Sequence, residues 1–235
     1  MNMISSIGFF GDSFCAVYKS KTVTTYIEQL AAHYGAKITN VGKHATSIGD
    51  LLLLQLNPVI DNNSIPDVSV FVWTDPNRLF NRKVRGIGRR SSLNLSDNTS
   101  SEIWRAAKQY YTHLHDWELT EMQYIAMMRY VDSKILPTFA DKTKIIHMWS
   151  FANFFGDKGL NEITYHHRWE TGVEIRPPLH YVASYNEDNI KLIEAGPNHL
   201  TTQSKNDLVF NWIKEAIDNY ESGKLIENIE GIEIT

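Results

Sequence analysis

The sequence predicts an α/β sandwich built on a mostly parallel β-sheet. Short apolar runs alternate with segments whose apolar residues recur at helical spacing, the pattern of strand–helix–strand units. The chain has 235 residues, 43% of them hydrophobic and 21% charged, which suits one domain with a full hydrophobic core. Its single cysteine, Cys15, excludes an intrachain disulfide framework.

Four apolar runs are predicted as strands of this sheet. Each is short and is bounded by turn-forming residues, as expected for a buried strand. The runs are Ile4–Phe10, Ala36–Val41, Val68–Trp73 and Thr143–Trp149.

Two amphipathic segments in the first quarter of the chain are predicted as helices. Thr22–Tyr34 has apolar residues near helical spacing, and Gly35 is expected to cap its C-terminus. Ser47–Leu56 is expected to be helical and to stop before Pro58.

Two further segments with helical character follow in the second half of the chain. Glu102–Leu136 is long, and the capping-box spacing of Thr120 and Gln123 predicts a division into two helices there. Ser204–Tyr220 carries a continuous apolar stripe and forms the last predicted helix.

The remaining segments are predicted as loops. The polar, basic stretch Asn77–Ser101 is one of them, and the region of about 151–190 is interpreted as an insertion able to form a lid. The expected domain is 1–223, and 224–235 is expected to be an acidic tail or an edge strand.

Charge and hydropathy exclude some classes of protein. The net charge of −4 argues against a protein that coats nucleic acid over its whole surface. The longest apolar run, Leu51–Leu54, is far too short to span a membrane. The first residues lack the basic region of a secretory signal, so a cytoplasmic location, or packaging into a virus particle assembled there, is expected.

A Gly-Asp-Ser sequence follows the first predicted strand, where parallel α/β sheets place their ligand sites. A serine on such a turn can direct Oγ and its own N–H into one space, as a nucleophilic Ser13 would require. The alternative is a simple helix cap made by Asp12 and Ser13. His199 precedes the last helix and could reach the same edge of the sheet.

The pairing of Gly11-Asp12-Ser13 with a late His199 resembles the SGNH (GDSL-type) hydrolase superfamily. The resemblance implies a flavodoxin-like three-layer α/β/α sandwich and hydrolysis of esters. It makes Ser13 the nucleophile and His199 the general base. The family's usual acid position holds Gly196 here, which leaves Glu194 as a substitute acid or a Ser–His dyad without one.

The resemblance also implies an oxyanion hole. Its donors would be the N–H groups of Ser13 and Gly42, with His44 taking the place of Gly42 under a second alignment. The family's third conserved block has an asparagine donor where this chain has Asp75, so Asn77 is the candidate replacement.

The altered third block allows several interpretations. Thr74, Asp75, Arg78 and the earlier Asp12 are candidate substrate-binding residues. Asp75 could stay protonated in a buried site, pair with Arg78, or bind a sugar hydroxyl. A Thr-Asp pair followed by arginine resembles phage-encoded members of the superfamily.

The loop after this block is rich in cations. Its basic residues are Arg78, Arg82, Lys83, Arg85, Arg89 and Arg90. Such a run can hold phosphate or carboxylate groups, or nucleic acid, or it can simply be solvated. The histidines His166, His167 and His180 lack metal-ligand spacing, so we expect no metal and no cofactor.

The sequence therefore favours a serine-dependent esterase acting on an acyl or O-acetyl group, with a carbohydrate as the preferred alcohol. The alternative is a weakly active or inactive SGNH fold that serves as a binding or structural module, for example in a virus particle. Phosphodiester chemistry at the basic loop is a third, less favoured option. The expected partner is a small-molecule or glycan ester, neither membrane nor nucleic acid is favoured, and a homo-oligomer stays open.

Overall fold

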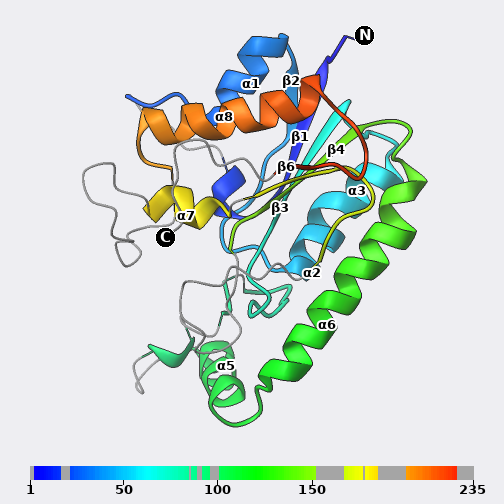
Figure 1. Cartoon of the computed structure of the whole chain (residues 1–235). Coiled ribbons are helices and arrows are strands. Elements are labelled where there is room, and N and C mark those ends of the chain that lie inside the picture. Colours follow the sequence, from blue (N-terminus) through cyan, green and yellow to red (C-terminus); the bar gives the residue numbers. More distant parts are fainter. Residues whose placement is uncertain are drawn as a thin grey trace.

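The computed structural model describes residues 3–16, 22–84, 86–88, 92–95, 101–151, 167–176, 178–184 and 200–226. These residues form a six-stranded sheet in the order β2-β1-β3-β4-β5-β6, and each neighbouring pair is parallel (Figure 1). The strands are β1 (Ser6–Gly11), β2 (Lys37–Asn40), β3 (Val68–Trp73), β4 (Lys144–Trp149), β5 (Val173–Ile175) and β6 (Leu225–Ile226). The predicted fold class, a three-layer α/β/α sandwich of flavodoxin-like order, is confirmed.

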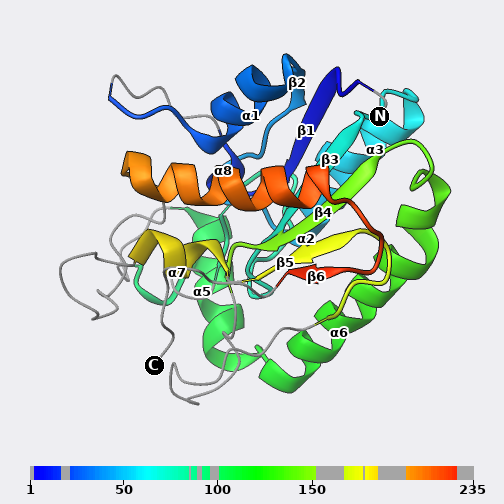
Figure 2. The ribbon, with the colours of Figure 1, turned by 45° about the horizontal axis from the view of Figure 1, so that its top comes forward.

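Helices α1 (Tyr26–Tyr34) and α8 (Gln203–Asp218) lie together over one face of the sheet (Figure 2). Their apolar sides enclose a core with the strands, with Leu30 and Ile213 fully buried in it. α1 begins with a capping box formed by Thr25 and Glu28, and it ends at Gly35, whose φ of 63° suits the predicted glycine cap.

The opposite face of the sheet is covered by a second set of helical segments. They are α2 (Ile48–Asp50), η2 (Leu51–Leu56), α3 (Asn57–Asp61), α6 (Trp117–Tyr130), η3 (Val131–Ile135) and η4 (Leu136–Thr138). An aromatic stack fills this core: the rings of Trp73 and Trp169 are 4.6 Å apart, and those of His147 and Trp169 are 4.0 Å apart. Within the described residues, no helix is long and apolar enough to cross a membrane.

The helix predicted to stop before Pro58 runs on to Asp61, so that boundary was wrong. Its middle part, η2, is a π-helix, in which Asn57 N–H bonds to the Leu52 carbonyl five residues back. Pro58 then stands at the start of α3, where a missing N–H is tolerated.

The long helical stretch is divided into two helices as predicted, but at a different residue. α5 (Glu102–His113) and α6 are separated by a short turn, and Asp116 caps α6 by accepting a hydrogen bond from Leu119 N. Thr120 lies inside α6 and donates its hydroxyl to the Asp116 carbonyl, so it is not the cap.

The region interpreted as a lid insertion supplies core elements instead. β5 is an inner strand of the sheet, and Val173 and Ile175 are fully buried. α7 (Leu179–Ser184) adds Leu179 and Val182 to the core shared with α8. A strand of three residues is too short to show a period, which is why the sequence pattern missed it. The rest of the proposed insertion, 152–166 and 185–190, lies outside the described residues.

The two ends of the basic loop are held against α5. Ile87 packs with Ala107 and Tyr111 in a small separate core, and an isolated antiparallel bridge joins Arg78 to Gly88. At the other end of the chain, β6 forms the edge of the sheet, and residues 227–235 lie outside the described part.

Candidate active site

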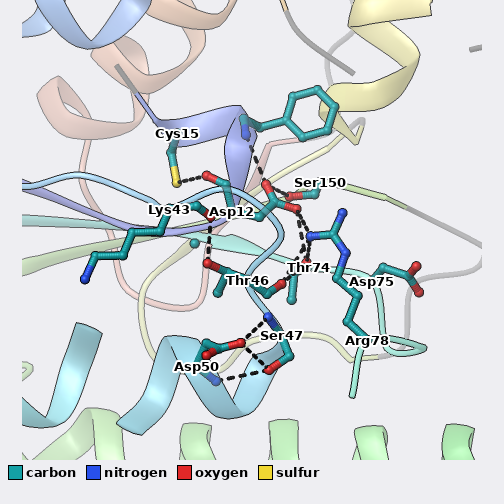
Figure 3. A network of polar contacts seen from close by, with 12 residues as sticks. Asp12, Cys15, Lys43, Thr46, Ser47, Asp50, Thr74, Asp75, Arg78 and Ser150 are labelled. Atoms are coloured by element: carbon teal, nitrogen blue, oxygen red, sulfur yellow. Dashed lines mark hydrogen bonds and ion pairs between the residues drawn. The ribbon is translucent and has the colours of Figure 1, made fainter. Parts of the chain in front are cut away.

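Three polar side chains meet at the carboxyl ends of adjacent parallel strands. Asp12 follows β1, Thr74 follows β3 and Ser150 follows β4, and all three are buried (Figure 3). Because parallel strands end at the same edge of a sheet, residues far apart in the sequence are brought together there.

Asp12 is the centre of this cluster, since its carboxylate accepts four hydrogen bonds. Oδ1 accepts from Phe14 N at 3.0 Å and from Ser150 Oγ at 2.8 Å. Oδ2 accepts from Thr74 Oγ1 at 3.0 Å and from Arg78 Nη1 at 3.0 Å. A fully buried charge is thus compensated by one cation and three dipoles, which fixes the ends of three strands relative to one another.

Arg78 reaches into the cluster from the loop after β3. Its Nη1 also contacts Thr74 Oγ1 at 2.8 Å and the Thr46 carbonyl at 3.1 Å, and its guanidinium lies 5.4 Å from the ring centre of Phe151. The suggested pairing of Asp75 with Arg78 was wrong, because the ion pair forms with Asp12. A loop that folds back over the strand ends brings the arginine to the more deeply buried of the two carboxylates.

Ser13 begins a short 3₁₀ turn, η1 (Ser13–Cys15), directly after Asp12. Asp12 caps this turn, so the capping interpretation holds for the aspartate. Within the described part of the chain, neither the N–H nor the Oγ of Ser13 makes a hydrogen bond, and the residue is 8% exposed. A nucleophilic serine with one oxyanion donor requires both groups to be unengaged by the protein, and the described residues meet this requirement.

The partners assigned to Ser13 near the end of the chain cannot be placed. His199 and Glu194 lie outside the described residues, so the Ser13–His199 dyad stays a prediction.

Gly42 does not have the role expected for it. Its N–H donates to the Cys15 carbonyl at 2.8 Å, so it is committed to the protein and is not free for an oxyanion. A Cβ at this position would lie 2.3 Å from Cys15 Sγ and 2.5 Å from the Asp12 carbonyl oxygen. Glycine is needed here because two backbone segments approach each other closely.

Gln55 is a site residue that the sequence analysis missed. Its Oε1 accepts from Gly11 N and its Nε2 donates to Gly11 O, both at 2.9 Å, and Nε2 also contacts Thr46 Oγ1 at 3.2 Å. The amide thereby ties the end of β1 to the loop after β2. The available signal was a lone polar residue inside the apolar run of residues 51–56.

Asp75 and Asn77 form a local turn beside the cluster. Asp75 Oδ1 accepts from Asn77 N at 2.8 Å and from Asn77 Nδ2 at 3.0 Å. Burial raises the pKa of Asp75, and this effect exceeds the opposing influence of Arg78 and of the hydrogen bonds from Asn77. In Figure 3 the Asp75 carboxyl lies on the far side of Arg78 from Asp12. The Asn77 amide is engaged with Asp75, so this geometry does not support its assignment as an oxyanion donor.

Two buried tyrosines from α5 and α6 hold the loop after β3. Tyr124 donates its hydroxyl to the Thr74 carbonyl at 2.6 Å, and Tyr111 donates to the Asn77 carbonyl. Burial is the main cause that raises the pKa of both tyrosines, so both remain neutral donors. Contacts between residues separated by 34 and 50 positions leave no mark in the sequence, which is why neither tyrosine was expected there.

His167 and His180, two of the histidines considered as metal ligands, form hydrogen bonds with other parts of the protein. His167 Nε2 is 2.9 Å from Asp132 Oδ2, and the backbone N–H of His180 donates to the Ser150 carbonyl at 3.0 Å. Burial lowers the pKa of His180 to about 4, so its imidazole is neutral at pH 7. Among the described residues, no group of three or more histidine, cysteine or acidic side chains could hold a metal ion.

Comparison with known proteins gives little more than this geometry. No protein-family model matches the chain, and no curated protein matches it. Among solved structures, the chain is similar to a protein from Parabacteroides merdae ATCC 43184 named as a GDSL-like lipase, with 16% identity and a TM-score of 0.27. That match covers 65% of this chain and 62% of the other, and at this distance it carries no conclusion about function.

Proposed function

We propose that this chain is a serine-dependent ester hydrolase of the SGNH type, with Ser13 as its nucleophile. The observation that carries the proposal is the state of Ser13: it stands at the carboxyl end of β1, and within the described residues its Oγ and N–H have no protein partner. The Asp12 carboxylate accepts hydrogen bonds from Phe14 N and Ser150 Oγ, and these bonds hold the turn that carries the Ser13 hydroxyl in a fixed position.

The proposed reaction has two steps. In the first, His199 removes the Ser13 proton, Oγ attacks the acyl carbonyl, and the alcohol leaves with the proton that His199 returns. In the second, His199 deprotonates a water molecule, whose oxygen attacks the acyl-serine carbonyl; the bond to Oγ breaks, the acid is released and His199 returns the proton to Ser13 Oγ. The N–H of Ser13 faces the negative oxygen in both steps. Glu194 is the candidate to orient His199.

This site is expected to be slow. Gly42 N–H and the Asn77 amide are both engaged elsewhere, so of the donors Ser13, Gly42 and Asn77 only the Ser13 N–H remains, and His44 N–H stays the alternative to Gly42. Losing one oxyanion donor typically lowers kcat by about 10²–10³-fold.

An acyl group on a carbohydrate is the substrate class we propose. Exposed cationic and polar side chains lie on the two loops that follow β2 and β3, and a hydrogen bond of 3.2 Å from Gly86 N to the Ala45 carbonyl joins these loops. These side chains are Lys43, His44, Arg82 and Lys83. Such side chains suit a hydroxyl-rich alcohol because they offer it charged hydrogen-bond donors.

A binding module is the second candidate, and the same hydrogen bonds favour it. If the engaged donors at Gly42 and Asn77 leave too little stabilisation for an oxyanion, the fold would hold its ligand without cleaving it. In that case Ser13 would serve as a ligand contact and could be replaced by alanine with little loss of structure.

The deciding experiment is intact-mass analysis after treatment with a fluorophosphonate probe. We expect one adduct on the wild type, none on Ser13→Ala, and strongly slowed labelling of His199→Ala. Ser133→Ala is the matched control, because this exposed serine donates to the Arg129 carbonyl on α6 and should not affect labelling. His180→Ala tests whether the other histidine at this edge acts as the base.

The outcomes separate the two functions. Absence of an adduct on folded wild type would reject the hydrolase and favour the binding module. Labelling that survives Ser13→Ala would reject Ser13 as the nucleophile, and labelling lost only in His180→Ala would transfer the role of base from His199.

A further inference from the structure

Helix α6 has two contrasting sides. Tyr124 and Met128 point into the core against the sheet and are buried. On the other side, Leu119, Met122 and Tyr130 are 52%, 68% and 59% exposed. Together with the exposed Ala126, these three residues are spaced three or four residues apart along one side of the helix. We call the four the α6 stripe: Leu119, Met122, Ala126 and Tyr130.

The α6 stripe faces away from the rest of the described structure. α6 runs along the outer margin of the molecule, with the sheet on one side of it (Figure 1). Large apolar side chains gathered on one exposed helix side are typical of a surface that binds a partner.

The charges beside the stripe have opposite sign at its two ends. Glu118 lies in the first turn of α6 and Arg129 in the last, and both are exposed. They are eleven residues apart, about three helical turns, so they lie on the same flank of the stripe. An acidic end and a basic end on one flank are complementary to the same helix running in the opposite direction.

We propose that the α6 stripe is the interface of a symmetric homodimer in which two α6 helices pack antiparallel about a two-fold axis. In this arrangement Leu119 packs against Tyr130 of the second copy, and Met122 against Ala126 of the second copy. The same register places Glu118 opposite Arg129 of the second copy. For each of the three pairs, the midpoint between its two sequence positions marks where the two-fold axis must cross α6. The three midpoints agree to within one residue.

A two-fold axis makes each of these contacts occur twice, which is how an isologous interface becomes self-complementary. Binding of a partner with a different sequence would not require the midpoints of the apolar pairs and of the charged pair to coincide. Their coincidence therefore favours a second copy of this chain. Because one helix side is a small interface, the dimer is expected to be weak and to depend on protein concentration.

The helix dipole accounts for part of the same charge pattern, since it favours Glu118 at the N-terminus and Arg129 at the C-terminus of α6. The two causes give different results when both charges are exchanged. Exchange removes the favourable dipole contribution in every copy, but it restores opposite charges across an antiparallel interface.

Analytical ultracentrifugation over a concentration series, with the whole chain, tests the proposal. We expect a monomer–dimer equilibrium for the wild type. Each of Glu118→Arg and Arg129→Glu is expected to weaken it at least about tenfold, because each places like charges opposite each other twice. The double variant is expected to regain wild-type dimerisation while its melting temperature stays lowered. Met122→Asp is expected to abolish the dimer, and Glu215→Arg, an exposed site on α8, is the matched control.

Several results would overturn the proposal. A wild type that stays monomeric at its highest soluble concentration would exclude the homodimer and leave the stripe to another partner. A dimer that survives Met122→Asp would place the interface elsewhere. A double variant as weak as its parents would reject the antiparallel register.

Discussion

Asp12 and Arg78 form a buried ion pair, with 3.0 Å between Oδ2 and Nη1, although 66 positions separate them in the sequence. The side chain of Asp12 is fully buried and that of Arg78 is 14% exposed. The pair ties the first strand end to the loop after β3, and it places a fixed charge pair directly beside Ser13.

Replacing one partner of this ion pair is expected to lower the free energy of unfolding more than the loss of the pair itself would, because the other charge stays buried without a counter-charge. Asp12→Asn should destabilise the protein by about 3 kcal/mol, because a mostly buried guanidinium loses its counter-charge. The double variant with Arg78→Met should be clearly less destabilised than the sum of the two single variants. Urea unfolding of all four proteins measures the coupling, and strictly additive values would contradict a direct pair.

Gly42→Ala is expected to be severely destabilising, by about 3 kcal/mol or more, because a Cβ has no space beside Cys15 Sγ and the Asp12 carbonyl. Gly35→Ala is the matched control: its φ of 63° is strained for alanine, but nothing lies within 4 Å of its Cβ position. That control should lose only roughly 1–2 kcal/mol. If thermal unfolding showed the same loss of stability in both variants, the backbone at Gly42 would not lie as close to Cys15 and Asp12 as described.

Asp75→Asn should raise stability near neutral pH. Burial raises the pKa of Asp75 in the folded protein, so the protonated form is favoured there. The favourable contribution is complete below the ordinary carboxyl pKa and is lost as pH rises through the folded value. The advantage of the variant should therefore shrink as the pH is lowered toward 4. Urea midpoints across this range test it, and a variant less stable than wild type at pH 7 would contradict the assignment.

His147 makes stability fall in mild acid. Burial lowers its pKa to about 3, and in the neutral form Nδ1 accepts from Trp73 Nε1 while Nε2 donates to the Thr171 carbonyl. Between pH 6.5 and the folded value, the unfolded chain binds the proton more readily, so stability is lost as pH falls. The loss from this group should reach about 2 kcal/mol at pH 5.

His147→Leu isolates this effect. The variant should be less stable at pH 7, because Trp73 Nε1 loses its acceptor, but its stability should change less between pH 7 and pH 5. His180, whose pKa burial lowers to about 4, contributes in the same direction in both proteins. An unchanged pH dependence in the variant would show that His147 is not the main acid-sensitive group.

Local sequence patterns predicted the regular elements well where they were long. The four apolar runs became β1 to β4, and the amphipathic segments became α1 and α8, because burial on one side imposes a period that the residues must follow. β5 was missed because its three residues are too few to show a period. The helix predicted to stop before Pro58 was found, but its end was misplaced because the chain continues through a π-helical segment into α3.

The candidate site was predicted in part. The strand-end rule located Asp12, Ser13 and Thr74, since it depends only on the direction of the chain. Hydrogen-bond partners were not predictable in the same way. From the sequence, Gly42 N–H could donate either to an oxyanion or to a backbone carbonyl. It donates to a carbonyl because the fold places the Cys15 carbonyl within hydrogen-bond distance.

The α/β class, the order of the first elements and the place of a serine at the end of β1 could all be predicted from the sequence. These properties follow from hydrophobic periodicity and turn chemistry, which act between neighbours in the chain. Only the folded arrangement shows that Asp12, not Asp75, pairs with Arg78, that Gln55 bonds to Gly11, and that the other described residues leave one side of α6 exposed. Those results depend on which distant segments meet, and a buried polar group selects the partner that packing brings within hydrogen-bond distance.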